Sequence, residues 1–491
     1  MRSYQQEVAI FALAVCACLS LAAPRSWSAE AHNLKVGVAK VDITPKDLTG
    51  ITGIGPRPYA GVHDRLYARA LVMDDGKVVA AMVTLDLVEM GNTMPLRERI
   101  AKESGIPADH IMINASHDHS APRAGPVTAG TSSAEGRPYS PPAYIQQVDE
   151  SIVEVLKQAK SALQPARMGF GTGTVDVSVA RYGYSPARGW RDSPNEDIPT
   201  DKTVSVVKFE TPAGAPIAIM FNYAVHSNAM SGEPSNMING DLAGNAEKFI
   251  EHQYGDKVVA LWSMSAAADV YPKFNWNMGH LDDSSSPFYA VEIQGGMLGG
   301  EVVKVAKRIT DMTDTVDMWA SERAVPCEMN ATPNNNTPPG GGNGGQNGGP
   351  GAGQNGGPNG GPNGGGQNGG PNGAGQNAAG GAPRQPQAPP KQLLPPVKPG
   401  DKLDIHMGLI RINQLVITSV SGEVGSEILQ HLKKESPFAD TIMITLSNDR
   451  DGYIPDDAGW DHQGNGQAFV RGCAEKVIVD NLVEMIDATL K

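Results

Sequence analysis

The chain has 491 residues, which is enough to bury a large core and to form two or three domains. Hydrophobic residues make up 40% of it, charged residues 19%, and the formal net charge is −13. Because an acidic surface without a basic run repels phosphate, this composition argues against nucleic acid as a partner.

The N-terminus contains an apolar stretch over residues 8–23, followed by small residues with an Ala29-Glu30-Ala31 pattern that a signal peptidase could cut. The stretch is too short for a comfortable membrane-spanning helix. Residues 1–31 are therefore predicted to be a signal peptide, which implies a secreted or periplasmic protein with no transmembrane segment after its removal. The alternatives are a buried N-terminal helix and a lipoprotein signal at Cys16, where the preceding valine fits poorly.

Apolar runs then alternate with amphipathic segments through most of the chain, which predicts an α/β (mixed α+β) fold with a layered core. The strands are expected at 34–43, 67–73, 78–85, 111–113, 166–179, 205–209, 217–224, 258–264, 405–412, 414–420 and 441–446. The helices are expected at 94–103, 143–163, from about 240, and at 289–309, 425–434 and 474–490. Asp74-Asp75-Gly76 separates two of the strands and is typical of a hairpin turn.

Two histidines, His117 and His119, follow the strand expected at 111–113. If the strand stays extended through them, both imidazoles point to one side and Asp118 points to the other, so two nitrogens are presented to one metal. The competing interpretation is a chance His-x-His sequence in a solvent loop. A third histidine, His226, also follows a strand, and Glu423 lies between a strand and a helix, where ligands are often found.

Two cysteines, Cys327 and Cys473, remain after removal of the signal peptide. In an exported protein they could pair, and the alternative is two unpaired buried thiols. Their spacing does not resemble a cysteine cluster that binds zinc.

Residues 332–400 consist mainly of Gly, Asn, Gln and Pro, with almost no apolar side chain. Such a segment cannot bury enough surface to offset the entropy of ordering, which predicts a disordered insertion. We expect residues 32–331 and 401–491 to form a single catalytic domain around it. A linker to a separate small domain is the alternative.

The order of several short motifs resembles the neutral/alkaline (non-lysosomal) ceramidase family, over nearly the whole chain outside the signal peptide and the tract. The motifs are His117-Asp-His119-Ser-Ala-Pro, Ala224-Val-His226-Ser, Gly240-Asp241-Leu-Ala-Gly244, Ala268-Asp269-Val-Tyr271-Pro272, Gly422-Glu423 and Ser447-Asn-Asp-Arg-Asp-Gly452-Tyr453. The resemblance implies a zinc amidase with a mixed α/β catalytic domain. The implied zinc ligands are His117, His226, Glu423 and Tyr453, and the implied catalytic residues beside the metal are His119, Arg181, Asp269 and Tyr271.

This ligand set agrees with the chemistry of zinc, which accepts imidazole nitrogen and carboxylate oxygen and keeps a position open for water in hydrolytic sites. Bound zinc lowers the pKa of water to roughly 7 and polarises a carbonyl. His119 would then move a proton to the leaving group, while Arg181 or Tyr453 would stabilise the oxyanion.

The sequence also departs from the family pattern. Tyr271 occupies the place of a serine in the family, and its bulk would narrow the pocket for a sphingoid amide. Asp118 replaces a threonine, Ala121 replaces a glycine, and the family's C-terminal immunoglobulin-like domain has no counterpart after Tyr453.

These observations predict an exported zinc-dependent hydrolase that cleaves a linear amide, in ceramide or another N-acyl lipid, through zinc-activated water. The expected partners are this lipid or acyl-amide substrate and, in peripheral contact, a membrane. One alternative is a zinc esterase or amidase that acts on a non-lipid substrate. The other is a catalytically silent secreted protein that keeps the ceramidase-like fold.

Overall fold

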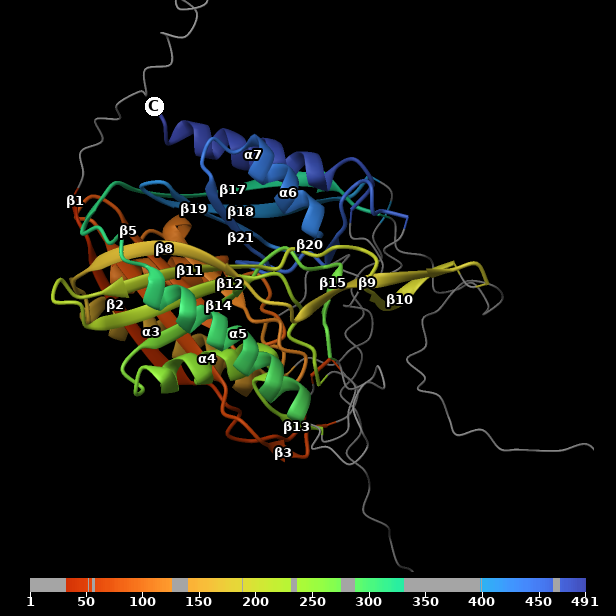
Figure 1. The fold of residues 1–491 in the computed structure, drawn as a ribbon, viewed down its shortest axis with the longest axis horizontal. Helices are drawn as coiled ribbons and strands as arrows, with labels where there is room; N and C mark the ends of the chain where they lie inside the picture. Colours follow the sequence, from red (N-terminus) through yellow and green to blue (C-terminus); the bar gives the residue numbers. More distant parts are fainter. Residues whose placement is uncertain are drawn as a thin grey trace, which may run out of the picture.

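The computed structural model describes residues 32–51, 53–54, 58–125, 140–187, 189–230, 236–274, 288–330, 398, 400–461 and 469–491. The predicted signal peptide and nearly all of the 332–400 tract lie outside the described residues. The α/β fold class is confirmed, since mixed sheets alternate with helices along the chain (Figure 1).

Three mixed sheets form the centre, and each contains the same succession of an antiparallel hairpin, a helix and a strand parallel to the second hairpin strand. In the first sheet these elements are β4 (Tyr67–Asp74), β5 (Val79–Leu85), α2 (Met94–Ser104) and β6 (Ile111–Ala115). In the second they are β11 (Thr203–Glu210), β12 (Pro216–Tyr223), α4 (Asp241–Gln253) and β14 (Val259–Met264). In the third they are β18 (Lys402–Ile412), β19 (Leu415–Val420), α6 (Ser426–Glu435) and β21 (Asp440–Ile444).

Further strands complete the sheets at their edges: β2 (Lys35–Asp42) and β7 (Gln164–Pro165) in the first, β8 (Arg167–Thr174) in the second, and β17 (Met318–Glu328) in the third. The resulting strand orders are β6-β5-β4-β2-β7, β14-β12-β11-β8 and β17-β18-β19-β21.

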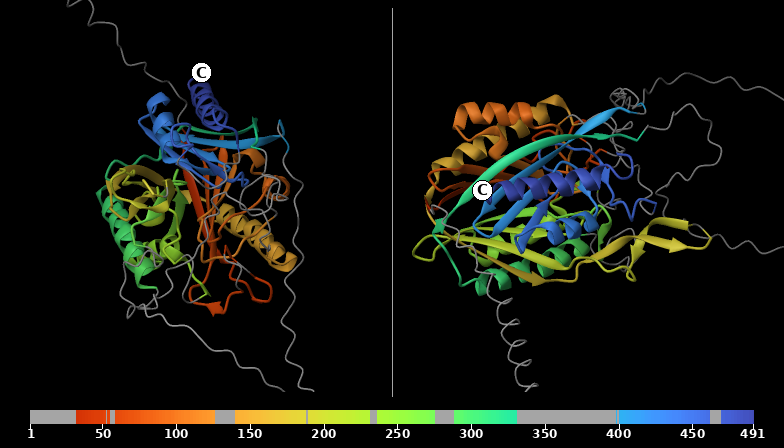
Figure 2. Two further views of the ribbon diagram at one scale, coloured as in Figure 1. Left: turned by 90° about the vertical axis from the view of Figure 1, so that its right-hand side faces the viewer. Right: turned by 90° about the horizontal axis from the view of Figure 1, so that it is seen from above.

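The three sheets face one another around a shared apolar core, and helices cover their outer faces (Figures 1 and 2). The covering helices are α3 (Pro142–Ser161) on the first sheet, α4 and α5 (Tyr289–Arg308) on the second, and α6 and α7 (Ala474–Ala488) on the third. Neighbouring strand residues alternate between the two sides: Val206 packs under α4 and α5, whereas Val207 enters the shared core. Strands buried on both faces explain the continuous apolar runs in the sequence.

The turn residues agree with the hairpins that the sequence predicts. Gly76 has φ +87° between β4 and β5, and its amide donates to Asp74 Oδ1 at 2.7 Å. Asn413 has φ +54° in the tight connection between β18 and β19, a conformation that asparagine tolerates better than most residues.

The single strand predicted at 166–179 is wrong, because the chain leaves the second sheet after Thr174. Asp176 lies between two strands at this point and forms ion pairs with Lys202 and Lys273 at 2.8 and 2.5 Å. The chain then enters a separate sheet of order β10-β9-β15, formed by β9 (Ser178–Ser185), β10 (Gly189–Asn195) and β15 (Val270–Pro272). Apolar alternation runs through both strands, so it could not reveal the break.

The strands on either side of the 332–400 tract pair with each other. In the antiparallel pair of β17 and β18, Glu328 lies opposite Lys402. Cys327 on β17 forms a disulfide with Cys473 at the start of α7, so the paired alternative holds for the cysteines. The insertion in a single domain remains a prediction, and this pairing supports it. No helix in the described ranges is both long and apolar enough to cross a bilayer.

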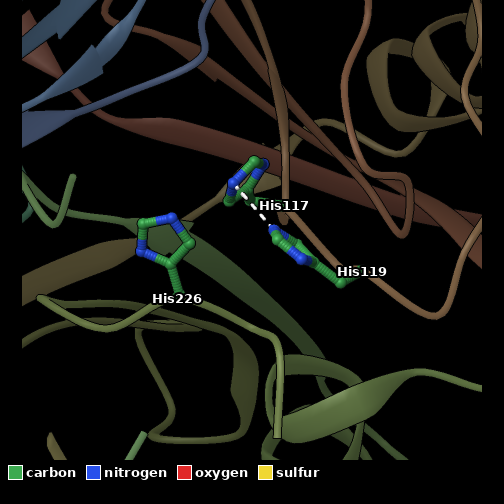
Figure 3. A group of neighbouring side chains, drawn as sticks. All are labelled: His117, His119 and His226. Carbon is green, nitrogen blue, oxygen red and sulfur yellow. Dashed lines mark hydrogen bonds between the residues drawn. The ribbon is translucent and has the colours of Figure 1, made fainter. Parts of the chain in front are cut away.

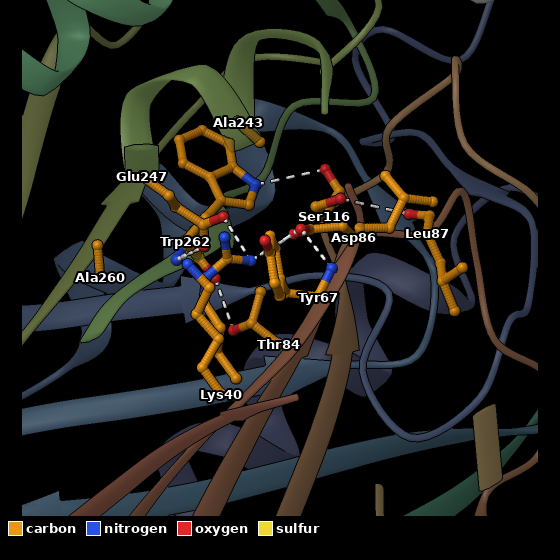
Figure 4. A network of polar contacts seen from close by, with 12 residues as sticks. Lys40, Tyr67, Thr84, Asp86, Leu87, Ser116, Ala243, Glu247, Ala260 and Trp262 are labelled. Atoms are coloured by element: carbon orange, nitrogen blue, oxygen red, sulfur yellow. Dashed lines mark hydrogen bonds and ion pairs between the residues drawn. The ribbon is translucent and has the colours of Figure 1, made fainter. Parts of the chain in front are cut away.

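A largely buried charge cluster connects the first sheet with α4 (Figure 4). This Arg69 cluster consists of Lys40, Arg69, Asp86, Glu247 and Glu251. Arg69 Nη1 lies 2.7 Å from Asp86 Oδ1 and 2.7 Å from Glu247 Oε2. Glu247 also accepts the backbone N–H of Trp262, whose indole donates to the carbonyl of Ser116 at 3.3 Å. The cluster therefore supports the residue next to His117.

Candidate metal centre

Three of the predicted metal ligands lie just beyond strand ends at one edge of the three-sheet assembly: His117 follows β6, His226 follows β12 and Glu423 follows β19. The fourth, Tyr453, lies further along the chain after β21. Ligand sites in open α/β sheets form in the same way, outside the carboxyl ends of neighbouring strands.

The local geometry predicted for the two-histidine motif is wrong, although the two rings do meet. Strand β6 ends at Ala115, and His117 has φ +59°, so the chain turns there instead of staying extended. The Asp118 carboxylate accepts the backbone N–H of Ser120, and this bond stabilises the turn. The turn brings His119 Nε2 to 3.1 Å from His117 Nε2.

His117, His119 and His226 form a cluster whose ring nitrogens lie within 4.8 Å of one another (Figure 3). Glu423 completes it, because its Oε2 lies 3.3 Å from His117 Nε2 and 3.3 Å from His226 Nε2. His117, His226 and Glu423 are almost completely buried. Four potential donor atoms from three separate strand ends therefore converge on one small region.

Backbone carbonyls set the orientation of two of the imidazoles. His117 Nδ1 lies 2.9 Å from the carbonyl oxygen of Val88, and His226 Nδ1 lies 3.0 Å from that of Val270. A carbonyl can only accept, so each Nδ1 carries a proton and the Nε2 of each neutral ring is left unprotonated. This arrangement is typical of histidines that bind metal through Nε2.

The electrostatics of the cluster favour neutral His119 and His226 beside an ionised Glu423 carboxylate. Burial lowers the pKa of His226 to about 4 and holds the pKa of His119 well below its usual value, with the neighbouring histidines adding to the effect on His119. Burial alone would raise the pKa of Glu423, but His117 and His226 hold it well below its usual value. Neutral imidazole and carboxylate are the protonation states that a metal requires.

The donor set fits a divalent cation. Among the described residues, no hydrogen-bond donor faces His226 Nε2 or Glu423 Oε2, although both atoms are buried. Buried lone pairs without partners are costly, and a cation between them removes that cost. Two or three imidazole nitrogens with one carboxylate oxygen match the ligand preference of zinc.

Tyr453 and Arg181 reach the same edge. The short strands β20 (Glu423–Val424) and β22 (Tyr453–Ile454) are parallel, and Glu423 lies opposite Tyr453 in their register. Arg181, on β9, donates from Nη1 to the Tyr453 hydroxyl at 3.0 Å. Its guanidinium is buried and could meet a negative charge that develops near the cluster.

Of the other two predicted catalytic residues, only Tyr271 lies beside the cluster. Its ring centroid lies 5.8 Å from that of His226, and the two rings are nearly perpendicular. Asp269 is directed elsewhere, because both of its carboxylate oxygens accept hydrogen bonds from Ser426, at 2.9 and 2.7 Å, at the start of α6. Its geometry is that of a residue that anchors a helix.

Sequence reasoning missed several charged residues around the cluster. Arg450 pairs with Glu89 and lies 4.0 Å from Glu423 Oε1, the carboxylate oxygen that faces away from the histidines. Arg123 Nε lies 3.2 Å from Glu89. Asp192, on β10, binds both Arg181 and Tyr271. Arg450 lies within a motif that the sequence analysis used, whereas no sequence signal distinguishes Asp192 from a surface aspartate.

Comparisons with known proteins agree with this arrangement. The family model described as neutral/alkaline non-lysosomal ceramidase, N-terminal, matches residues 34–287, which is more than half of the chain. The neutral ceramidase of Pseudomonas aeruginosa is 24% identical over 299 residues. That alignment covers 57% of this chain and 42% of the relative's length.

Two solved structures share the fold. The crystal structure of neutral ceramidase from Pseudomonas aeruginosa superposes with a TM-score of 0.66 at 16% identity, over 94% of this chain and 75% of that one. A ceramidase complexed with C2 superposes with a TM-score of 0.64 at 18% identity, with the same coverage of both chains.

Proposed function

Because the chain belongs to the neutral/alkaline non-lysosomal ceramidase family, we propose that it is a zinc-dependent hydrolase that cleaves the amide bond of ceramide or another N-acyl lipid. The observation that carries the proposal is the convergence of His117, His226 and Glu423, with two buried lone pairs that lack a hydrogen-bond donor in the described structure. His117, His226, Glu423 and Tyr453 would hold the ion. A zinc ion in this position would polarise the scissile carbonyl and lower the pKa of water to roughly 7.

The neighbouring side chains supply the remaining steps of an amide hydrolysis. His119 is held neutral by burial, so it can take a proton from the attacking water and deliver it to the leaving nitrogen. Arg181, which already donates to the Tyr453 hydroxyl, would also donate to the oxygen that gains negative charge. Arg450 lies behind Glu423 and would help to hold its carboxylate toward the histidines.

A second candidate function is hydrolysis of a smaller amide or ester. Tyr271 favours it, because this aromatic side chain lies against His226 where the family motif carries a serine. A larger side chain leaves less space for a bulky substrate next to the metal.

We also propose that the protein is exported. The apolar stretch at residues 8–23 supports this proposal, and so does the disulfide between Cys327 and Cys473, because disulfides persist mainly in oxidising compartments. N-terminal sequencing of protein recovered from the periplasm or medium tests it: an intact N-terminus would contradict the predicted signal peptide.

The function is tested with purified protein reconstituted with zinc and supplied with a fluorescent ceramide, a short-chain N-acyl analogue and simple esters. We expect amide hydrolysis that is lost after treatment with a chelator and restored by zinc, because the ion would activate the attacking water. Hydrolysis of esters alone would favour the second candidate function. Complete inactivity of the zinc-loaded protein on all of these substrates would contradict both.

A further inference from the structure

Asp192 lies on β10, at the rim of the metal centre. Its carboxylate connects two side chains that face that centre. Its Oδ1 accepts from Arg181 Nε at 3.3 Å and its Oδ2 from Arg181 Nη2 at 3.1 Å. The Tyr271 hydroxyl donates to the same Oδ2 at 2.7 Å. One carboxylate therefore binds residues from both other strands of the β10-β9-β15 sheet.

The exposed fractions of the Asp192 and Arg181 side chains show that Arg181 depends more strongly on their ion pair. The Asp192 side chain is 42% exposed, whereas that of Arg181 is only 8% exposed. An exposed ion pair contributes little stability, but a buried guanidinium that loses its two-pronged partner keeps an uncompensated charge. The remaining contacts of Arg181 Nη1 are the Tyr453 hydroxyl at 3.0 Å and the Ala268 carbonyl at 3.3 Å. Asp192 thus fixes the orientation in which Arg181 meets Tyr453.

The same carboxylate fixes the Tyr271 ring between Arg181 and His226. The Arg181 guanidinium lies 4.6 Å from the centroid of that ring, and the His226 ring centroid lies 5.8 Å from it on an edge contact. Because the hydroxyl donates to Asp192, the ring is held beside His226 and not left free to rotate outward. In this position the ring lies directly next to the cluster.

We propose that Asp192 is a positioning residue, which holds Arg181 against Tyr453 and holds Tyr271 beside His226, and that the Asp192–Tyr271 pair limits the size of the substrate groups next to the scissile bond. The proposal rests on the proposed function and specifies which part of the site selects the substrate. Asp192 itself does not touch the reacting atoms.

Kinetics of three variants test the two effects separately. Asp192→Asn keeps the shape but removes the charge that orients Arg181, so kcat should fall on the order of 10- to 100-fold for every substrate. Asp192→Glu should recover part of this loss. Tyr271→Phe breaks only the bond to Asp192, so it should raise the ratio of kcat/KM for large over small substrates by about 10-fold.

The substrates are two series of N-acyl amides, one with increasing acyl length and the other with increasing size of the amine. Glu196→Gln is the matched control, since Glu196 is an exposed carboxylate just beyond β10, and it should behave as wild type. Wild-type kcat in Asp192→Asn, or an unchanged size preference in Tyr271→Phe in both series, would overturn the proposal.

A stability measurement separates failure of this proposal from failure of the proposed function. Even if the wild type hydrolyses none of the substrates, the melting temperatures of Asp192→Asn, Tyr271→Phe and the double variant show whether the Asp192 and Tyr271 side chains stabilise each other. Residues that bind each other give non-additive shifts, so the double variant should melt close to the less stable single variant. Strictly additive shifts would show that Asp192 does not hold Tyr271.

Discussion

Replacement of His226 by alanine is expected to remove the metal from the protein and to abolish hydrolysis. The imidazole supplies one of the few donor atoms that converge at the strand ends, and its Nε2 lies 3.3 Å from Glu423. Loss of even an outer partner of a metal ligand costs about 10- to 100-fold in affinity, so loss of a ligand should cost at least that much. The measurement is the zinc content per chain after gel filtration, together with the rate of hydrolysis.

His431→Ala is the matched control for this variant. His431 lies on α6, is 46% exposed and pairs with Glu475, so its loss should leave the zinc content and activity unchanged. His117→Ala should behave like His226→Ala, because the two rings occupy equivalent positions beside Glu423. Full retention of zinc in both variants would show that the ion binds elsewhere.

Replacement of Arg69 by alanine is expected to cause a large loss of stability, of about 3–5 kcal/mol, because it leaves buried carboxylates without their cation. Arg69 is 2% exposed and contacts Asp86, Glu247 and Glu251. The cluster also supports Ser116 through Trp262, so the metal-binding turn should loosen as well. Urea denaturation of the wild type and the variant gives the free energy of unfolding.

Arg65→Ala provides the comparison, because Arg65 pairs with Asp42 at the surface and its side chain is 71% exposed. Its loss should cost between about 0 and 1 kcal/mol. Similar costs for both variants would contradict a buried charge cluster that depends on Arg69.

The loss of unfolding free energy in the Arg69→Ala variant should also depend on pH. Burial raises the pKa of Glu247 well above its usual value, and Arg69 opposes that rise. Without Arg69 the folded-state pKa moves higher still, so the folded protein keeps a proton that the unfolded chain releases. A carboxyl group with a higher pKa in the folded state destabilises that state only at pH values above its unfolded-state pKa. The loss of unfolding free energy should therefore be smaller near pH 5 than near pH 8.

The sequence predicted the regular elements well where apolar periodicity is continuous. The hairpin at Asp74-Asp75-Gly76 and the buried strands formed as expected, because strands covered on both faces need long apolar runs. The family resemblance, drawn from the order of short motifs, is also confirmed. The break between β8 and β9 was missed, since the apolar pattern does not record which sheet a strand joins.

The structure brings most of the predicted site residues together, but not in the local geometry that the sequence predicts. His117 and His119 meet through a left-handed turn and not along an extended strand, and the His117 ring is oriented by a hydrogen bond from its Nδ1 to the carbonyl of a distant residue, Val88. Glu89 could not be found, because its partner Arg450 lies far away in the sequence. Asp192 could not be found either, because its contact with Arg181 depends on the unpredicted pairing of β9 with β10. For Asp269 the motif was misleading. Asp269 lies in the same motif as Tyr271, but its carboxylate binds Ser426 at the start of α6.

The central claim, a metal centre built from three strand ends, is tested most directly by anomalous X-ray diffraction at the zinc edge from crystals of the zinc-loaded protein. We expect one strong peak bonded to His117 Nε2, His226 Nε2 and Glu423 Oε2, at the zinc–nitrogen distance of about 2.0–2.1 Å. A crystal without a peak among these three side chains, or with its zinc bound only at other residues, would contradict the account.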